Sequence, residues 1–205
     1  QELAKVQQGG FRVRRVWSPN LGKGSLLRRV ADNAAYIIGS AGSAMTTERA
    51  DRLLVLTSPP MYPAVGALLN AFRREPYLYV TMDLYPDIAI QAGVLPRRGL
   101  LPRLLRSVTR ASLQRAHRVI VLGTCMAERI RAYGVPPERI AIVRNWADEE
   151  AIRPLAPKDN PLRKQLGLQG KFVVMYSGNM GVAHRFDDIL HVAGELSPRD
   201  DIRFL

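Results

Sequence analysis

The sequence is poor in the residues that several classes of protein require. It has one cysteine, Cys125, in 205 residues, which excludes an internal disulfide and suits a reducing compartment. The three histidines, His117, His184 and His191, show no metal-ligand spacing with the cysteine or with one another. No apolar run reaches the roughly 18 residues that a membrane-spanning helix needs. We therefore expect no disulfide scaffold, no metal site and no membrane span.

Acidic residues are also few. The chain has 30 Lys and Arg against 18 Asp and Glu, a formal net charge of +12. A basic surface attracts phosphates, nucleic acid or anionic lipid, and charge alone does not choose among them. Aromatic residues alternate with Arg only in "FRVRRVW" (11–17), and no known nucleic-acid reader motif is present. A non-catalytic nucleic-acid-binding protein stays an alternative, but we favour a chain that binds no nucleic acid.

Composition and chain ends suggest a piece of a globular protein. Hydrophobic residues make up 47% of the chain and charged residues 23%, which is ordinary for a globular domain. There is no initiator methionine, and the last residues, "DIRFL", resemble the start of a strand. We expect a fragment cut at both ends, in which a missing N-terminus would hide any signal peptide.

Apolar runs alternate with amphipathic stretches along most of the chain. Short, continuous apolar runs are typical of strands that are covered on both faces, and apolar residues at helical spacing predict helices between them. This order predicts an α/β protein with a parallel sheet flanked by helices, whose strands near 52–57, 77–82 and 118–122 are neighbours or nearly so. Strands are predicted at 11–17, 52–58, 77–83, 118–123 and 139–143, and helices at 25–45, 64–72, 99–116 and after Thr124, which can cap its helix with Glu128 near the first turn.

The alternation is interrupted after the fourth apolar strand. The stretch "NWADEEAIRPLAPKDNP" (145–161) is polar and contains three prolines, which predicts a linker. A short helical stretch, "LRKQLGL", follows. The chain then continues with "KFVVMYSGNMGVAHRFDDIL" (171–190), which predicts a strand, a turn and a helix. We place a domain boundary near residues 146–160.

The turns that follow the predicted strands are the candidate binding sites, because ligands of open parallel sheets bind beyond the carboxyl ends of the strands. In "SGNMG", Gly178 and Gly181 allow the backbone to approach a ligand, and Arg185 adds positive charge near a helix start. This arrangement suits a phosphate, yet it matches neither the dinucleotide fingerprint nor a Walker A loop. A phosphate site and a plain tight turn both stay open.

Two carboxylates occur in "MDLYPD" (82–87). Asp83 ends a predicted strand, where groups that contact a substrate gather. Asp87 follows Pro86 and occupies the first turn of a predicted helix, where an acidic residue is favourable. We favour a structural role for Asp87.

Four stretches occur together in one order, and they carry a resemblance to a known family. They are "VLTSPPMYPAVGALL" (55–69), "MDLYPDIAIQAGVL" (82–95), "IAIVRNWADEEAIRPL" (140–155) and "VVMYSGNMGVAHRFDDIL" (173–190). With them the chain resembles the bacterial family 4 glycosyltransferases of the GT-B fold, in the branch that builds cell-surface polysaccharides. The resemblance covers nearly the whole chain, from about Phe11 onward.

The resemblance implies two Rossmann-like domains that face each other across a cleft. The first, here 1–147, would bind the acceptor, and residues 148–160 would be the linker. The second, here 161–205, would begin the domain that binds the nucleotide sugar. The family's Gly-rich loop would precede Gln1 and its Glu-x7-Glu motif would follow Leu205. We therefore expect the parent protein to be an enzyme and the isolated fragment to be inactive.

The resemblance also implies roles for single residues. Many relatives carry a His where Met82 stands, and Met cannot take a proton, so the catalytic residue stays unknown, with Asp83 as the remaining polar candidate. At the hinge, Trp146 replaces the Gly of the usual Asn-Gly-x-Asp form. The implied sets are Gly178, Asn179, Gly181 and Arg185 for the donor, Pro59, Pro60, Asp83 and Tyr85 for the acceptor cleft, and Asn145 and Asp148 for the hinge.

The chemistry that the resemblance implies is transfer of a glycosyl unit from a nucleotide sugar to a lipid-linked or glycan acceptor. It would proceed with retention, without a metal or a cofactor, and in the cytoplasm. A nucleotide-sugar epimerase, which is also built on two such domains, stays an alternative. On the predicted helix 99–116, Leu101, Leu104, Leu105, Val108 and Ser112 would share one face. Arg103, Arg106 and Arg110 would lie opposite, either solvated or against anionic lipid on the inner face of the membrane.

Overall fold

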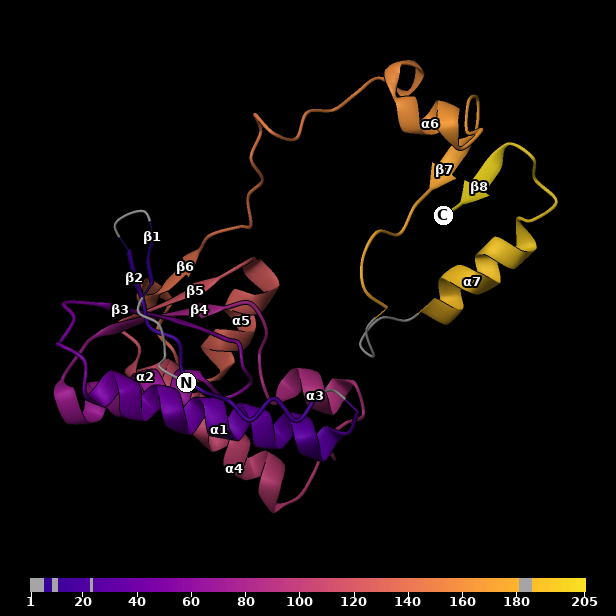
Figure 1. Ribbon diagram of the computed structural model, residues 1–205. Coiled ribbons are helices and arrows are strands. Elements are labelled where there is room, and N and C mark those ends of the chain that lie inside the picture. The colour runs from indigo at the N-terminus through magenta and orange to yellow at the C-terminus, as the bar shows by residue number, and fades with distance from the viewer. Residues whose placement is uncertain (1–5, 9–10, 23, 181–185) are drawn as a thin grey trace. The chain divides into compact units, whose positions relative to one another are not determined.

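The computed structural model describes residues 6–8, 11–22, 24–180 and 186–205. The chain divides into two compact units, Gln1–Asn145 and Trp146–Leu205. Figure 1 shows the elements of both units along the chain. Each unit is described by itself below.

Unit 1 is built on a four-stranded parallel sheet with the order β3-β4-β5-β6. Leu53 pairs with Tyr77, Leu78 with Arg118, and Val119 with Ile140, and each pairing is parallel. The predicted parallel arrangement of the three central apolar runs is therefore confirmed. The strands are β3 (Leu53–Leu56), β4 (Tyr77–Thr81), β5 (Arg118–Val121) and β6 (Ile140–Ile142).

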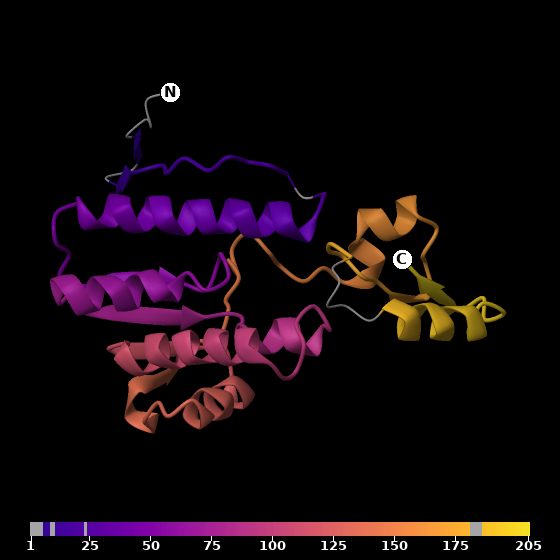
Figure 2. The same cartoon turned by 90° about the horizontal axis from the view of Figure 1, so that it is seen from below.

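The helices of unit 1 alternate with these strands. Predicted helix 25–45 is confirmed, and the hydroxyl of Ser25 caps it by accepting a hydrogen bond from the Arg28 amide at 3.3 Å. α1 and α2 pack side by side in both views (Figures 1 and 2). The helices are α1 (Leu26–Met45), α2 (Pro63–Arg73), α3 (Asp87–Gln91), α4 (Leu100–Arg115), α5 (Thr124–Ala132) and the 3-10 helix η1 (Pro137–Arg139).

One face of the sheet carries the core. Tyr77, Tyr79 and Val121 are buried there together with side chains of α4 and α5. The alternate positions of β3, Leu54 and Leu56, are exposed. The strands follow one another in chain order and such connections are right-handed, so α2, α4 and α5 return over the same face. On β3 the second face is therefore open, whereas Leu78 and Val80 of β4 and Ile120 of β5 are half-buried on that face.

Close contact between α2 and the sheet depends on Gly66. A Cβ atom at this position would lie 2.9 Å from Cγ2 of Val55 and 3.0 Å from Cδ2 of Tyr77. Since both neighbours are buried core side chains, any larger residue would force the helix away from the sheet. The absence of a side chain at Gly66 therefore sets the distance between α2 and the sheet in the β3–α2–β4 unit.

Two local predictions need correction. α5 begins at Thr124 itself, its N-cap residue is Gly123, and no side chain caps it, so Glu128 lies beyond the first turn. The predicted strand 11–17 is shorter: β2 (Phe11–Val13) pairs antiparallel with β1 (Val6–Gln8). The alternating residues beyond Val13 run as irregular chain instead.

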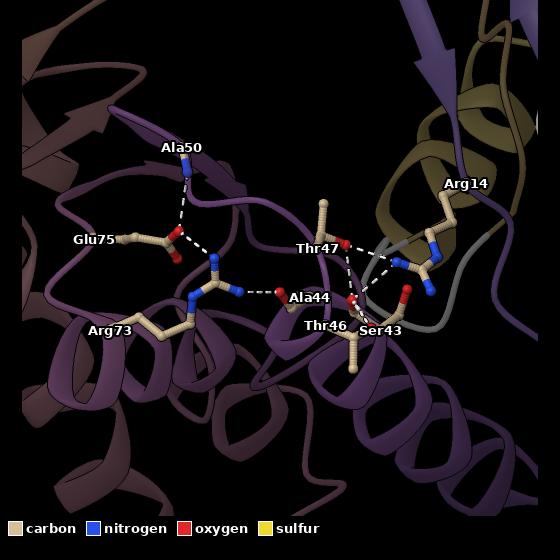
Figure 3. Close-up of polar contacts among 8 residues, drawn as sticks. All are labelled: Arg14, Ser43, Ala44, Thr46, Thr47, Ala50, Arg73 and Glu75. Carbon is tan, nitrogen blue, oxygen red and sulfur yellow. Dashed lines mark hydrogen bonds and ion pairs between the residues drawn. The ribbon is translucent and has the colours of Figure 1, made fainter.

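A buried ion pair fastens α1 and α2 to the start of β4 (Figure 3). Arg73, at the end of α2, donates from Nη2 to the Glu75 carboxylate at 2.9 Å, and the two side chains are 9% and 5% exposed. Arg73 also donates to the Ala44 carbonyl at the end of α1. The same carboxylate oxygen of Glu75 accepts the Ala50 amide at 2.9 Å. Nearby, Arg14 donates to the Thr47 hydroxyl at 2.7 Å, which ties the preceding chain to the same corner.

Unit 2 contains a parallel strand–helix–strand unit. β7 (Phe172–Val174) pairs with β8 (Ile202–Phe204), with Phe172 opposite Ile202, and α7 (Phe186–Glu195) connects them. The interpretation of "DIRFL" as a strand is confirmed. Before β7, the Asn160 side chain caps α6 (Pro161–Gln165) by accepting the Leu162 amide at 3.0 Å. The 3-10 turn η2 (Pro157–Asp159) lies in the predicted linker.

We predict that Glu75→Gln lowers the free energy of unfolding of unit 1 by about 3 kcal/mol. The substitution leaves the Arg73 guanidinium buried without a countercharge, and breaking a buried pair in this way costs about 3 to 5 kcal/mol. Urea unfolding followed by circular dichroism measures it. Glu48→Gln, at an exposed position before β3, is the control. Equal urea-unfolding midpoints for the two variants would show that the Arg73–Glu75 ion pair does not stabilise the contact between α1, α2 and β4.

Candidate functional site

Thr57 joins the carboxyl ends of β3 and β4. Its side chain is buried, its hydroxyl donates to the Val80 carbonyl at 2.9 Å, and the same oxygen accepts the Met82 amide at 3.0 Å. One side chain therefore satisfies two backbone groups that the strand ladder leaves unpaired. The turns after the two strands are held next to each other as a result, as expected for the binding edge of a parallel sheet.

The turn after β3 contains the predicted acceptor-cleft residues Pro59 and Pro60. Both are half-buried, and the Ser58–Pro59 peptide is cis. The turn closes when the Tyr62 amide donates to the Pro59 carbonyl at 3.0 Å, one residue before α2 begins. The two prolines therefore lie in the short turn that connects β3 to α2.

The turn after β4 holds Asp83 and Tyr85, which the sequence placed in the same cleft. Both residues are half-buried, and the pKa of the Tyr85 hydroxyl is raised by burial and by the nearby Asp83 carboxylate. The Thr109 hydroxyl of α4 donates to the Tyr85 carbonyl at 2.8 Å, which holds the turn against α4. Met82, beside Asp83, is exposed. The structure thus brings Asp83 and Tyr85 together at the carboxyl edge.

A small cavity lies behind this edge rather than on it. Thr57, Met61, Tyr79, Tyr85 and Thr109 are among its lining residues, and its volume is about 10 Å³. That volume holds about one water molecule and no sugar.

Asp87 has a structural role, as the sequence suggested. It is the first residue of α3, and its two carboxylate oxygens accept hydrogen bonds from Nε of Arg106 at 3.3 Å and from the Tyr133 hydroxyl at 2.9 Å. These contacts join α3, α4 and the end of α5. Arg106 therefore does not belong to a free basic face of α4. Tyr133 was missed, because nothing in the local sequence links it to a residue 46 positions away.

The predicted donor turn follows β7. Gly178 and Asn179 are exposed, and the Tyr176 hydroxyl donates to the Asn179 carbonyl at 2.9 Å. The Tyr176 ring meets the Phe186 ring edge-on, with centroids 4.9 Å apart, so it braces the turn against the first residue of α7. A Cβ atom at Gly178 would lie 3.2 Å from the Tyr176 hydroxyl. Gly181 and Arg185, the other two predicted donor residues, lie outside the described residues.

The sequence reasoning missed two features of this turn. Tyr176 precedes "SGN" directly, and its position two residues before Gly178 was the available signal. Asp187 and Asp188 both lie in the first turn of α7. Acidic residues are favourable at a helix N-terminus, but they also repel an anionic ligand there, so a bound phosphate would need a compensating cation.

The predicted hinge residues lie at the division between the units. Asn145 is the last residue of unit 1, and Asp148 follows at the start of unit 2. The Asp148 carboxylate accepts the amides of Glu150 at 3.0 Å and Ala151 at 3.1 Å, which folds the chain into a local turn. Trp146, the residue in place of the family's Gly, is exposed.

Other features that the sequence left open can be checked in the part of the chain that the structure describes. There, no three His, Cys, Asp or Glu side chains gather in a way that could hold a metal ion. None of the described helices has the length and apolar character needed to span a bilayer.

The chain belongs to the glycosyl transferase 4-like family. The model of the glycosyl transferase 4-like domain matches residues 1–146, which is unit 1 and the first residue beyond it. The family resemblance that the four motifs carry is therefore confirmed.

Named relatives match a larger part of the chain. The probable glycosyltransferase WbjE of Pseudomonas aeruginosa is 26% identical over 173 residues, which is 84% of this chain and 43% of WbjE. WcaI of Escherichia coli K12, whose name assigns it provisionally to colanic acid biosynthesis as a glycosyl transferase, is 24% identical over 179 residues, 84% of this chain and 44% of WcaI. The chain thus spans less than half the length of these relatives.

Solved structures share the fold. HepE of Anabaena in complex with UDP matches with a TM-score of 0.56 and 15% identity, over 87% of this chain and 52% of HepE. HepE in complex with UDP-glucose matches with a TM-score of 0.55, over 88% of this chain and 53% of HepE. At this identity the match confirms the predicted α/β fold of GT-B type and no more.

We predict that unit 1 loses stability above about pH 10. Burial raises the pKa values of Tyr77, Tyr79 and Tyr133 above the usual value of about 10, and for Tyr133 the hydrogen bond to Asp87 adds to the effect. Above that pH the unfolded chain ionises these hydroxyls while the folded chain keeps them protonated. The free energy of unfolding then falls by about 1.4 kcal/mol per pH unit for each tyrosine.

Urea unfolding at a series of pH values from neutral to alkaline measures this slope. Tyr79→Phe removes one titrating hydroxyl for which the described residues show no hydrogen bond, and it should give a shallower decline above pH 10. The two curves should run parallel below that pH. A wild-type stability that stays constant through this range would contradict the burial of the three hydroxyls.

Proposed function

We propose that the whole protein that carries this chain is a glycosyltransferase that moves a glycosyl unit from a nucleotide sugar to a lipid-linked or glycan acceptor. The observation that carries the proposal is membership of the glycosyl transferase 4-like family over unit 1. The names of WbjE and WcaI, and the complexes of HepE with UDP and UDP-glucose, support the same chemistry. By the same resemblance, the transfer proceeds with retention, without a bound metal, at the cytoplasmic side of the membrane.

In this proposal the turn after β7 binds the diphosphate of the donor. Gly178 and Asn179 are exposed on the turn, and the ring of Tyr176 braces it from within. Breaking the bond between sugar and diphosphate leaves negative charge on the leaving group. Hydrogen-bond donors of the protein that already point at the site of this charge lower the barrier, because they do not have to reorganise during the reaction. In this proposal Arg185 supplies positive charge to the diphosphate.

The carboxyl edge of β3 and β4 contacts the acceptor. Asp83 is half-buried there, and its carboxylate accepts no hydrogen bond among the described residues. Asp83 can therefore accept a hydrogen bond from an acceptor hydroxyl, with the Tyr85 hydroxyl beside it. Pro59 and Pro60 provide a rigid wall for the sugar ring.

We also propose that the first half of α4 contacts an anionic membrane. Leu101 and Leu104, which the sequence placed on the core face, are exposed, and Leu100 is 83% exposed. The core face is formed by Pro102, Thr109, Ser112 and Leu113. The three leucines lie among the exposed Arg97, Arg98 and Arg103. Exposed apolar side chains within a basic surface suit a lipid interface, since leucine enters the acyl boundary while arginine meets the headgroups.

We predict that Arg185→Ala in the whole protein lowers kcat/KM for the nucleotide-sugar donor by about 10- to 150-fold. A charge-assisted hydrogen bond is worth about 1.5 to 3 kcal/mol, and each 1.4 kcal/mol is a factor of ten. Steady-state kinetics at varied donor concentration measures the loss. Arg203→Ala on β8 is the control, since its side chain is exposed and 4.0 Å from its partner Asp200.

Full donor efficiency in Arg185→Ala would mean that the turn does not bind the diphosphate. The products of the same assay separate the two enzyme classes. A glycosyltransferase releases a nucleoside diphosphate and needs the acceptor, whereas an epimerase converts the nucleotide sugar to an isomer without one.

We predict that Leu100→Ser combined with Leu104→Ser reduces binding to phosphatidylglycerol vesicles, and that Arg103→Glu reduces it by at least about fivefold. Each Arg near an anionic surface contributes about 1 kcal/mol. Co-sedimentation at low and high salt measures both effects. Arg131→Glu, an exposed position on α5, is the control. Equal losses for Arg103→Glu and Arg131→Glu would show that general charge, rather than this surface, drives binding.

A further inference from the structure

A second concave site lies at the opposite edge of the sheet. The amino ends of β4 and β5, the end of α4 and η1 surround a pocket of about 500 Å³. Small-molecule sites have volumes of about 300 to 1,000 Å³, so this space is large enough for a ligand. The turns assigned to the acceptor lie at the carboxyl ends of the same strands, and the donor turn lies in unit 2. The pocket is therefore separate from the acceptor edge, and its lining residues all belong to unit 1.

Three guanidinium groups line this pocket, and none has a carboxylate partner among the described residues. Arg118 donates through Nη1 to the Glu138 carbonyl at 3.0 Å, and Arg139 donates through Nη1 to the Gln114 carbonyl at 3.2 Å. These bonds fix the two side chains and leave their remaining N–H groups available, because a guanidinium has five donors. The two groups are thus held in place before any ligand binds.

The third guanidinium, that of Arg115, makes no hydrogen bond or ion pair among the described residues. Arg115 is the last residue of α4, and its side chain is exposed at the mouth of the pocket next to His117. Two negative contributions oppose an anion here: the Glu138 carboxylate and the C-terminal end of α4, which is equivalent to about half a negative charge. The three positive charges of the guanidinium groups exceed these two negative contributions together, so the net charge of the pocket is positive.

We propose that this pocket binds a soluble, phosphorylated small molecule. Guanidinium groups pair with phosphate oxygens through two parallel hydrogen bonds, a geometry that an ammonium group does not offer. The concave shape and the volume of about 500 Å³ suit a compact ligand. The excess of positive charge favours a ligand with two or more negative charges, such as a diphosphate or a bisphosphate.

Titration of the 205-residue chain with sodium pyrophosphate, followed by amide nuclear magnetic resonance, tests the proposal. We expect saturable shifts of the amides of residues 115–118, 138 and 139. Arg115→Gln should weaken this binding by about tenfold, the loss of one charge-assisted contact at a partly exposed site. The variant breaks no described hydrogen bond, and a thermal melt checks that it stays folded. Arg28→Gln, at an exposed position on α1 and outside the pocket, should bind as the wild type does.

The other outcomes overturn the proposal. One is the absence of saturable shifts at the highest soluble pyrophosphate concentration, and another is equal weakening by Arg115→Gln and Arg28→Gln. Shifts of these amides with phosphatidic acid vesicles or with a DNA duplex, but not with pyrophosphate, would assign the surface to a headgroup or to nucleic acid instead. Because the shifts are read at residues of unit 1, the result is independent of whether the turn after β7 binds a donor.

Discussion

The buried pair of Arg73 and Glu75 is the interaction on which the architecture of unit 1 depends. It joins the end of α1, the end of α2 and the start of β4 through one guanidinium and one carboxylate (Figure 3). Burial of the two charges is costly, and the hydrogen bonds to Ala44 and Ala50 offset part of that cost. Since β3 and β4 start from this corner, their register and the position of the turns at their far ends follow from it.

Because the strands are parallel, the turns that follow the strands lie at one edge of the sheet and the residues that precede them lie at the other. At the carboxyl edge, Thr57 and Thr109 hold the turns that present Pro59, Asp83 and Tyr85. At the amino edge, the start of β5 and η1 present guanidinium groups that are held by backbone carbonyls. The helix α4 reaches both edges: Thr109 contacts the turn after β4, and Arg115 lines the pocket.

Local sequence patterns predicted the strands, most helices and the turns that follow the strands, because apolar periodicity and Gly or Pro positions are local signals. They failed where residues far apart in the chain meet. Asp87, Arg106 and Tyr133 come from three helices, so their cluster left no local signal, and Arg106 was placed on a free basic face. Leu101 and Leu104 fit the helical period, yet the neighbours that would cover them do not reach that end of α4. The family motifs pointed to the turn after β7 as a candidate site, but they did not single out Tyr176, which braces that turn.

The most direct test of the proposed function is the mass of the acceptor after reaction. The whole protein is incubated with a panel of nucleotide sugars and a membrane lipid extract, and products are followed by mass spectrometry. The account predicts that one nucleotide sugar yields its nucleoside diphosphate together with an acceptor that is heavier by one sugar residue. Release of no nucleoside diphosphate from any donor, or conversion of a nucleotide sugar to an isomer without an acceptor, would contradict it.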